Sequence, residues 1–260
     1  MDANAKSMEI GFDRVVDERS HSSRMHRAVS EIGRQLGPPF FLGVVLVMIV
    51  ASAIGLLLTH VFEHSALVRL DIRIDKTLEA NRTPRLTHLT GLGTFFADPL
   101  PVATALFLAV VITSIAVRRW RPPFFLMFAV AGEKLSYYLT TLIVNRPRPP
   151  VQTVGQVHVT SSYPSGHVGS AISLWASVAL LVMTLIAGRL RPRAVVVAFI
   201  VGLFFAAEVG YSRLYRGHHY LTDVLVGAAI GTVWVILAYR VVLAPYLNEK
   251  ASKASRGATA

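Results

Sequence analysis

Six long apolar runs constrain this chain more than any other feature. They fall at about residues 38–62, 99–117, 122–144, 167–188, 194–212 and 220–243. Each is about 18–25 residues long, enough for a helix to cross the roughly 30 Å hydrocarbon core of a bilayer. A large soluble helical protein would not need six such runs in 260 residues. We therefore expect an all-α polytopic membrane protein, with six transmembrane helices in a domain over 38–243.

The segments outside the apolar runs are polar and small. Residues 1–37 have mixed charge and are expected to form a cytoplasmic tail, and residues 244–260 a disordered cytoplasmic tail. A secretory signal peptide is not expected, because the polar leader is too long and no small-residue cleavage site follows the first run. The chain has no cysteine, which excludes disulfides, thiolate metal sites and a cysteine nucleophile.

Positive charge is concentrated in short segments between the apolar runs. The net charge is +11, with basic residues gathered in 24–34, 118–121, 189–193 and 250–256. If there are six spans, these four segments share one side, which the positive-inside rule assigns to the cytoplasm. The five basic residues within 63–93 argue against this orientation. A nucleic-acid partner is not expected, since the charge flanks membrane spans and attraction to anionic membrane lipids explains it.

Three polar clusters stand at the ends of apolar runs. They are NRPRPP (145–150), SSYPSGH (161–167) and SRLYRGHHYLTD (212–223). In a six-span chain all three lie on the same face of the membrane. Ionisable groups at membrane depth are costly and usually functional, so the clusters predict one shared site. The GAAIG segment, Gly227 to Gly231, has GxxxG spacing and predicts close helix packing instead.

The adjacent histidines of the third cluster differ in their spacing to an acid. If the last span starts near Tyr220, His219 and Asp223 are four residues apart on one helical face. Asp223 can then accept a hydrogen bond from one ring nitrogen, leaving the other as a nucleophile or base. His218 has Thr222 at the corresponding position. The spacing therefore selects His219.

The second cluster has the pattern of an anion site. Ser165 and Gly166 in a turn at a helix start can offer a hydroxyl and backbone N–H groups to phosphate, with His167 beside them. Arg148 and Arg213 can supply forked donors for phosphate oxygens. Zinc is the rival interpretation of the histidines. No HExxH or comparable spacing is present, and the arginines would repel a cation, so no metal is expected.

These motifs resemble those of the type 2 phosphatidic acid phosphatases. The family signature is Lys-x6-Arg-Pro, Pro-Ser-Gly-His and Ser-Arg-x5-His-x3-Asp. The second part is complete at Pro164-Ser165-Gly166-His167, and the third at Ser212-Arg213, His219 and Asp223. The resemblance covers about residues 90–243.

The first part of the signature departs from the family. Thr141 stands seven residues before Arg148, where the family has lysine. The nearest lysine, Lys134, is two further helical turns away, about 10 Å, and is expected to lie too deep to touch phosphate. It is instead expected to pair with a buried acid such as Glu208. Arg146 is a candidate replacement for the missing cation.

The resemblance implies roles for the matching residues. His219 would attack phosphorus and form a phosphohistidine, Asp223 would orient it, and His167 would protonate the leaving oxygen and then activate water. The groups that would hold the phosphate oxygens are Arg148, Arg213, Ser165 and the N–H of Gly166. No cofactor is implied.

The implied substrate is a lipid phosphate. Undecaprenyl diphosphate, phosphatidic acid and phosphatidylglycerol phosphate all fit a site at the outer membrane interface. An Arg-rich, Ala-rich, Lys-poor chain suggests a GC-rich bacterium, and hence its cytoplasmic membrane with the site facing outward. Three alternatives stay open: a lipid phosphotransferase, a lipid-phosphate transporter or binding protein without turnover, and a vanadate haloperoxidase. The sequence does not indicate an oligomeric state.

Overall fold

A computed structural model describes residues 30–31, 33–155, 161–187 and 191–258, and every regular element among them is helical. The prediction of an all-α membrane protein is confirmed. The chain divides into two compact units, residues 1–42 and 43–260. Of the expected polar tail, residues 1–29 and 32 lie outside the described residues, whereas 33–37 are helical.

Among the described residues, five helices are long and apolar enough to cross a membrane. They are Gly33–Val61, Pro99–Val117, Gly166–Ala187, Pro192–Tyr215 and Leu221–Arg256. The first ends in the π-helical segment η1 (Leu57–Val61), and the second is α4. The third comprises α6 (Gly166–Ala171), η2 (Ile172–Ala176) and α7 (Ser177–Ala187), and the fourth is α8. The fifth comprises α9 (Leu221–Ala238), η3 (Tyr239–Leu243) and most of α10 (Ala244–Ala258).

The sixth expected span corresponds to α5 (Arg121–Ile143), which has 23 residues and is not among these five. It carries two adjacent charges in its interior, Glu133 and Lys134. Its inner face packs on α9, where the fully buried Trp234 donates a hydrogen bond to Ser136 at 3.0 Å. Six spans therefore remain a prediction.

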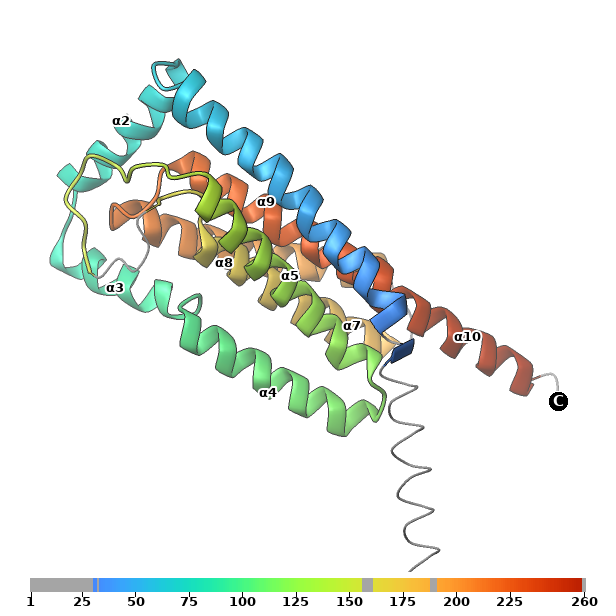
Figure 1. Ribbon diagram of the computed structural model, residues 1–260. Helices are drawn as coiled ribbons and strands as arrows, with labels where there is room; N and C mark the ends of the chain where they lie inside the picture. The colour runs from blue at the N-terminus through green and yellow to red at the C-terminus, as the bar shows by residue number, and fades with distance from the viewer. Residues whose placement is uncertain (1–29, 32, 156–160, 188–190, 259–260) are drawn as a thin grey trace, which may run out of the picture. The chain divides into compact units, whose positions relative to one another are not determined.

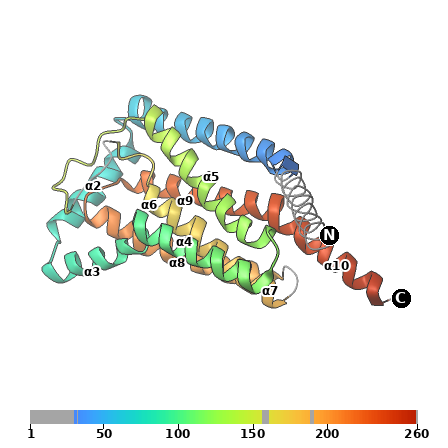
Figure 2. The ribbon, with the colours of Figure 1, turned by 60° about the horizontal axis from the view of Figure 1, so that its bottom comes forward.

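Two further helices, α2 (Ala66–Ala80) and α3 (Pro84–Phe95), occupy the segment between the first two apolar runs. Their starts follow from local chemistry. The hydroxyls of Ser65 and Thr83 accept hydrogen bonds from backbone N–H groups three residues on, and Pro84 stands in the first turn of α3. Figures 1 and 2 show α2 and α3 at the same end of the long helices as the segment after α5, while α10 extends from the other end of α9.

The outer faces of the long helices are apolar. In α4 only Val102 is buried, and large side chains such as Phe107 and Ile115 are exposed. Such surfaces are stable in lipid rather than in water.

The glycines of GAAIG do serve close packing. A Cβ on Gly227 would collide with the backbone carbonyl of Ser165, and one on Gly231 with that of Gly169. The missing side chains let α9 approach α6 at the level of the Pro-Ser-Gly-His turn.

The expectation of a disordered segment after residue 243 is wrong for 244–258, which form α10. These residues are rich in alanine and other good helix formers, and they continue α9 without a break. A Glu249–Lys253 ion pair of 2.6 Å, at i and i+4, adds local support.

Candidate active site

The three polar clusters come together at one end of the helices. The backbone N–H of Ser165, in the second cluster, donates to the carbonyl of Asp223 in the third at 3.0 Å. The N–H of Ser162 donates to the carbonyl of Arg146 in the first cluster at 2.9 Å. The guanidinium of Arg148 donates to the carbonyl of His218. Two hydrogen bonds between backbone groups and one from a side chain to a backbone carbonyl thus tie segments that lie far apart in the sequence.

The turn after α8 sets the direction of the two histidines. Gly217 has a φ of 70°, in the left-handed region that favours glycine. Its N–H donates to the carbonyl of Leu214 at 2.9 Å, and that of His218 to the carbonyl of Arg213 at 3.0 Å. A side chain at 217 would also strike Val151. The RGHH sequence therefore ends one helix and returns the chain toward the next.

His219 is buried and its ring is held at Nδ1. This nitrogen lies within hydrogen-bonding distance of the carbonyl of Ser162, and Oδ2 of Asp223 is 4.0 Å away. A carbonyl can only accept, so Nδ1 carries the proton and Nε2 keeps its lone pair. One ring nitrogen is thus held and the other is free, but the group that holds Nδ1 is the carbonyl of Ser162 and not the carboxylate of Asp223.

The difference arises because His219 is not helical. Helix α9 begins at Leu221, with Tyr220 as an extended N-cap residue. Oδ2 of Asp223 accepts from the backbone N–H of Tyr220 at 3.0 Å, so the carboxylate first caps its own helix. The i, i+4 geometry assumed from the sequence does not apply to a pair that straddles a helix start.

His218 has a different partner. Its Nε2 lies 2.8 Å from the carbonyl of Val154. The residue is buried, with 2% of its surface exposed. Its role in the described structure is to join the loop after α5 to the loop after α8.

His167 stands at the start of α6 and contacts a residue that sequence reasoning missed. Its Nε2 lies 3.1 Å from Oδ1 of Asp98, the residue preceding α4. The Asp98 side chain does not cap α4, so its carboxylate is available to the histidine. Its position before Pro99, at a predicted span start, was the only signal in the sequence.

Buried polar atoms near the histidines lack partners among the described residues. Oγ of Ser165 and Nε of Arg213 are in this state. Nη1 of Arg213 donates to Thr94 at 3.2 Å, and Nη2 of Arg148 to the carbonyl of Ser161 at 3.2 Å. Orphaned buried donors are costly, so their presence suits a site that binds an oxyanion.

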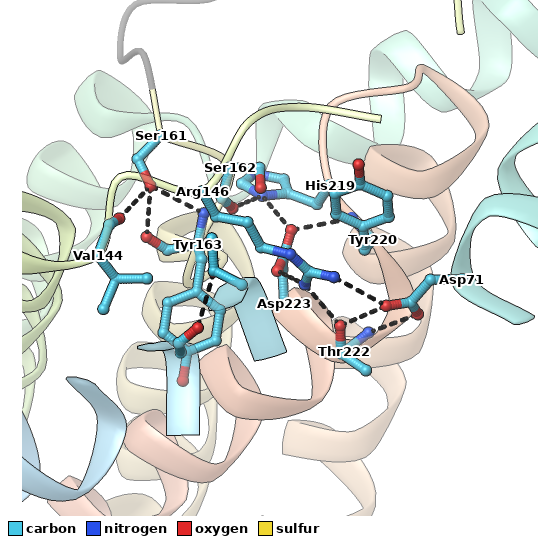
Figure 3. A network of polar contacts seen from close by, with 12 residues as sticks. Asp71, Val144, Arg146, Ser161, Ser162, Tyr163, His219, Tyr220, Thr222 and Asp223 are labelled. Atoms are coloured by element: carbon cyan, nitrogen blue, oxygen red, sulfur yellow. Dashed lines mark hydrogen bonds and ion pairs between the residues drawn. The ribbon is translucent and has the colours of Figure 1, made fainter. Parts of the chain in front are cut away.

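Arg146 occupies a different place from the one expected of a phosphate ligand. Its Nη1 donates to Oδ1 of Asp223 at 2.6 Å and to Thr222 at 2.7 Å, and its Nη2 donates to Asp71 at 3.3 Å. The guanidinium also lies over the ring of Tyr220, 4.1 Å from its centre. Figure 3 shows this network. Because two carboxylates already pair with Arg146, we assign it to Asp223 and not to phosphate.

Lys134 also differs from expectation. Its Nζ lies 3.5 Å from the carbonyl of Gly166 and 3.9 Å from Glu133, while Glu208 lies against Gly93 of α3. The hydroxyl of Thr141 only bonds back to its own helix at 3.0 Å. Lys134 reaches the Pro-Ser-Gly-His turn because that turn lies beside an earlier part of α5 and not beside its C-terminal end.

Electrostatics keep His219 neutral. Burial, followed by the positive charges of Arg213 and Arg148, lowers the pKa of His219 well below its usual value. Burial also lowers the pKa of His218, to about 3. Arg213 and Arg148 act on both histidines, whereas His167 is an electrostatic neighbour of His219 and not of His218.

The model of the PAP2 superfamily matches residues 98–246. The chain belongs to this superfamily. The matched region starts at Asp98 and contains all the PAP2 motif residues described above. It leaves out α2 and α3, so the candidate site contacts at least one helix beyond the matched residues.

Two solved structures are similar to this chain, and the first of them shares its fold. A transmembrane PAP2 type phosphatidylglycerolphosphate phosphatase from Bacillus subtilis has a TM-score of 0.62 and 22% identity, covering 76% of this chain and 92% of that chain. LpxE of Aquifex aeolicus has a TM-score of 0.48 and 21% identity, covering 66% of this chain and 95% of that chain. No curated protein matched the chain.

Proposed function

We propose that this protein is a membrane lipid phosphatase that removes the phosphate or diphosphate headgroup of a lipid through a phosphohistidine. The observation that carries the proposal is the state of His219: Nδ1 is fixed by the carbonyl of Ser162, and Arg213, Arg148 and His167 are its electrostatic neighbours. A neutral histidine beside cations suits attack on an anionic phosphate. Membership of the PAP2 superfamily supports the reaction class.

The first step is transfer of the phosphoryl group to His219. Nε2 forms a bond to phosphorus while the bond from phosphorus to the lipid oxygen breaks. His167 gives a proton to that oxygen, with Asp98 stabilising the positive imidazolium. Asp223, 4.0 Å from the ring of His219, stabilises its positive charge in the intermediate.

The second step is hydrolysis of the phosphohistidine. His167 takes a proton from water, the oxygen of which attacks phosphorus, and the bond to Nε2 breaks. Inorganic phosphate leaves and His219 is again neutral.

Fixed donors hold the phosphate oxygens during both steps. We assign this role to Arg148, Arg213, the hydroxyl of Ser165 and the N–H of Gly166, as the family motif implies. We add Lys134, since its ammonium already lies 3.5 Å from the carbonyl of Gly166. It would supply the charge that the family places at the position of Thr141.

The proposed setting is a bacterial cytoplasmic membrane, with six spans, both termini in the cytoplasm and the site facing outward. Candidate substrates are undecaprenyl diphosphate, phosphatidic acid and phosphatidylglycerol phosphate. The solved relative from Bacillus subtilis, described as a phosphatidylglycerolphosphate phosphatase, favours testing the last of these first.

The test is phosphate release from each of the three lipids in mixed micelles containing EDTA. Wild type should release phosphate, and His219→Ala should lose activity by about a thousand-fold or more, because the nucleophile is gone. His218→Gln is the matched control and should lose far less.

Retained activity in His219→Ala would overturn the assignment of the nucleophile. Release only when an acceptor lipid is added would indicate a phosphotransferase. Lipid binding without release, by a folded protein, would indicate a transporter or binding protein.

A further inference from the structure

Helix α2 lies outside the residues matched by the family model, yet it brings two buried carboxyl groups to the catalytic loops. Asp71 and Asp75 are each only 1% exposed. They stand four residues apart on one face of α2, between the first two apolar runs. A buried carboxylate is costly unless it is paired.

Both oxygens of Asp71 are used. Oδ1 accepts a hydrogen bond from the backbone N–H of Thr222 at 3.1 Å. Oδ2 accepts from the hydroxyl of Thr222 and from Nη2 of Arg146 at 3.3 Å. Thr222 is in the first turn of α9, one residue before Asp223, so α2 is fixed to the start of the helix that carries the catalytic aspartate.

Arg146 extends the contact to Asp223. Its Nη1 lies 2.6 Å from Oδ1 of Asp223, and the whole array is buried. The order of contacts is Asp71, Arg146, Asp223, His219, as Figure 3 shows. Asp75 makes no hydrogen bond in this array, because neither of its oxygens has a hydrogen-bond partner among the described residues. Burial, followed by the nearby negative charge of Asp71, raises the pKa of Asp75 to about 8, so its carboxyl is mostly protonated at pH 7 and adds little charge to the array.

We propose that Asp71 is a positioning residue that acts on His219 through Arg146 and Asp223. This rests on the proposed function. One cation is shared between two carboxylates, so Asp223 keeps part of its negative charge for the ring of His219. Without Asp71, Arg146 would pair with Asp223 alone and neutralise it. The phosphohistidine would then lose stabilisation, while groups that bind phosphate would be unchanged.

The predicted effect of Asp71→Asn is therefore on kcat more than on KM. We expect kcat to fall about 10- to 100-fold, which is the loss typically caused by removing a residue that orients a functional side chain. The acid limb of the pH profile should move to lower pH, because His219 would lose negative charge nearby. The charged or titratable groups that face His219 are Asp223 of α9, Arg213 of α8, Arg148 of the loop and His167 of α6.

The matched control is Asp75→Asn. It makes the same isosteric change, in the same helix and at the same burial, but at a carboxyl without contact to Arg146. Its kcat should stay within about threefold of wild type. Thermal unfolding of both variants in detergent reports any loss of folded protein.

The experiment measures kcat, KM and the pH profile on the best of the three lipids, with His219→Ala alongside. An active wild type in which Asp71→Asn behaves like Asp75→Asn would overturn the inference and leave the proposed function standing. A fall in kcat of Asp71→Asn that is accompanied by a lower unfolding temperature, with no change in the pH profile, would also overturn the inference.

Binding of orthovanadate keeps the inference testable without turnover. Vanadate imitates phosphorus bonded to five atoms and bonds to Nε2 of the nucleophile. Asp71→Asn should weaken its binding about tenfold or more relative to Asp75→Asn. Equal affinities in the two variants would overturn the inference whichever lipid is the substrate, whereas an inactive wild type would overturn the proposed function separately.

Discussion

At the residue scale, the neighbours of His219 decide its protonation. An unperturbed histidine titrates near pH 6.5. Here burial removes water from the charged ring, and Arg213 and Arg148 repel a proton, so the pKa falls. The spacing of the motif selects His219 as the candidate nucleophile but does not predict this pKa shift, because the arginines belong to other segments.

The lowered pKa predicts activity in mildly acidic solution. A group with a depressed pKa stays neutral until the pH falls below that depressed value, so the nucleophile remains available below pH 6.5, where an ordinary histidine becomes protonated. The dependence of kcat/KM on pH from 4.5 to 8 checks this, since it reports the free enzyme. An acid limb with its midpoint near 6.5 would contradict it.

Aspartates make most of the side-chain contacts that the sequence did not predict. Asp98 and Asp71 lie 69 and 151 positions from the residues they contact, His167 and Thr222. No periodicity or spacing within a segment indicates such pairs. They follow from which helix ends meet.

At the element scale, the depth of the Pro-Ser-Gly-His turn changes the role of α5. The turn packs beside Tyr137, since a Cβ on Gly166 would collide with that ring. Tyr137 is about two helical turns before the C-terminal end of α5 at Ile143. Lys134, which was expected from the sequence to lie too deep in the membrane to contact phosphate, is therefore at the same depth as the candidate site.

This geometry predicts that Lys134 binds phosphate. Lys134→Met should lower activity by about 100-fold, the usual cost of removing one fixed donor to a transition-state oxyanion. Adding Thr141→Lys, which restores the family pattern, should recover at least about tenfold of this loss if the new ammonium reaches the same oxygens. Phosphate release from the best lipid is the measurement.

Two controls make that result interpretable. Lys76→Met removes an exposed lysine of α2 and should have no effect. Lys134 lies 3.9 Å from the buried Glu133, so Lys134→Met leaves that acid without its cation. The double variant Glu133→Gln, Lys134→Met shows whether this unpaired acid causes the loss of activity. Full activity in Lys134→Met would exclude it as a phosphate ligand.

At the scale of the whole molecule, the number of spans fixes which ends share a side. With six spans, α2 and α10 lie on opposite sides of the membrane. If α5 did not cross, an odd number of crossings would separate the N-terminus from α10, and α2 and α10 would share a side. The absence of cysteine gives a clean background for testing this.

Thr77→Cys in α2 and Ser252→Cys in α10 both place the thiol on an exposed position. In intact cells, a membrane-impermeant maleimide should label Thr77→Cys and should label Ser252→Cys only after permeabilisation. Labelling of both without permeabilisation would contradict six spans. Labelling of Ser252→Cys alone would reverse the orientation.

The sequence by itself determined the all-α membrane fold, because apolar runs and their length act within one segment of the chain. It also determined the identity of the motif residues, whose spacing is local. Only the tertiary structure decided which groups face each other. Arg146 pairs with Asp71 and Asp223, and Lys134 reaches Gly166, because helix packing brings distant segments to one depth. These contacts depend on three-dimensional distance, which spacing along the chain does not specify.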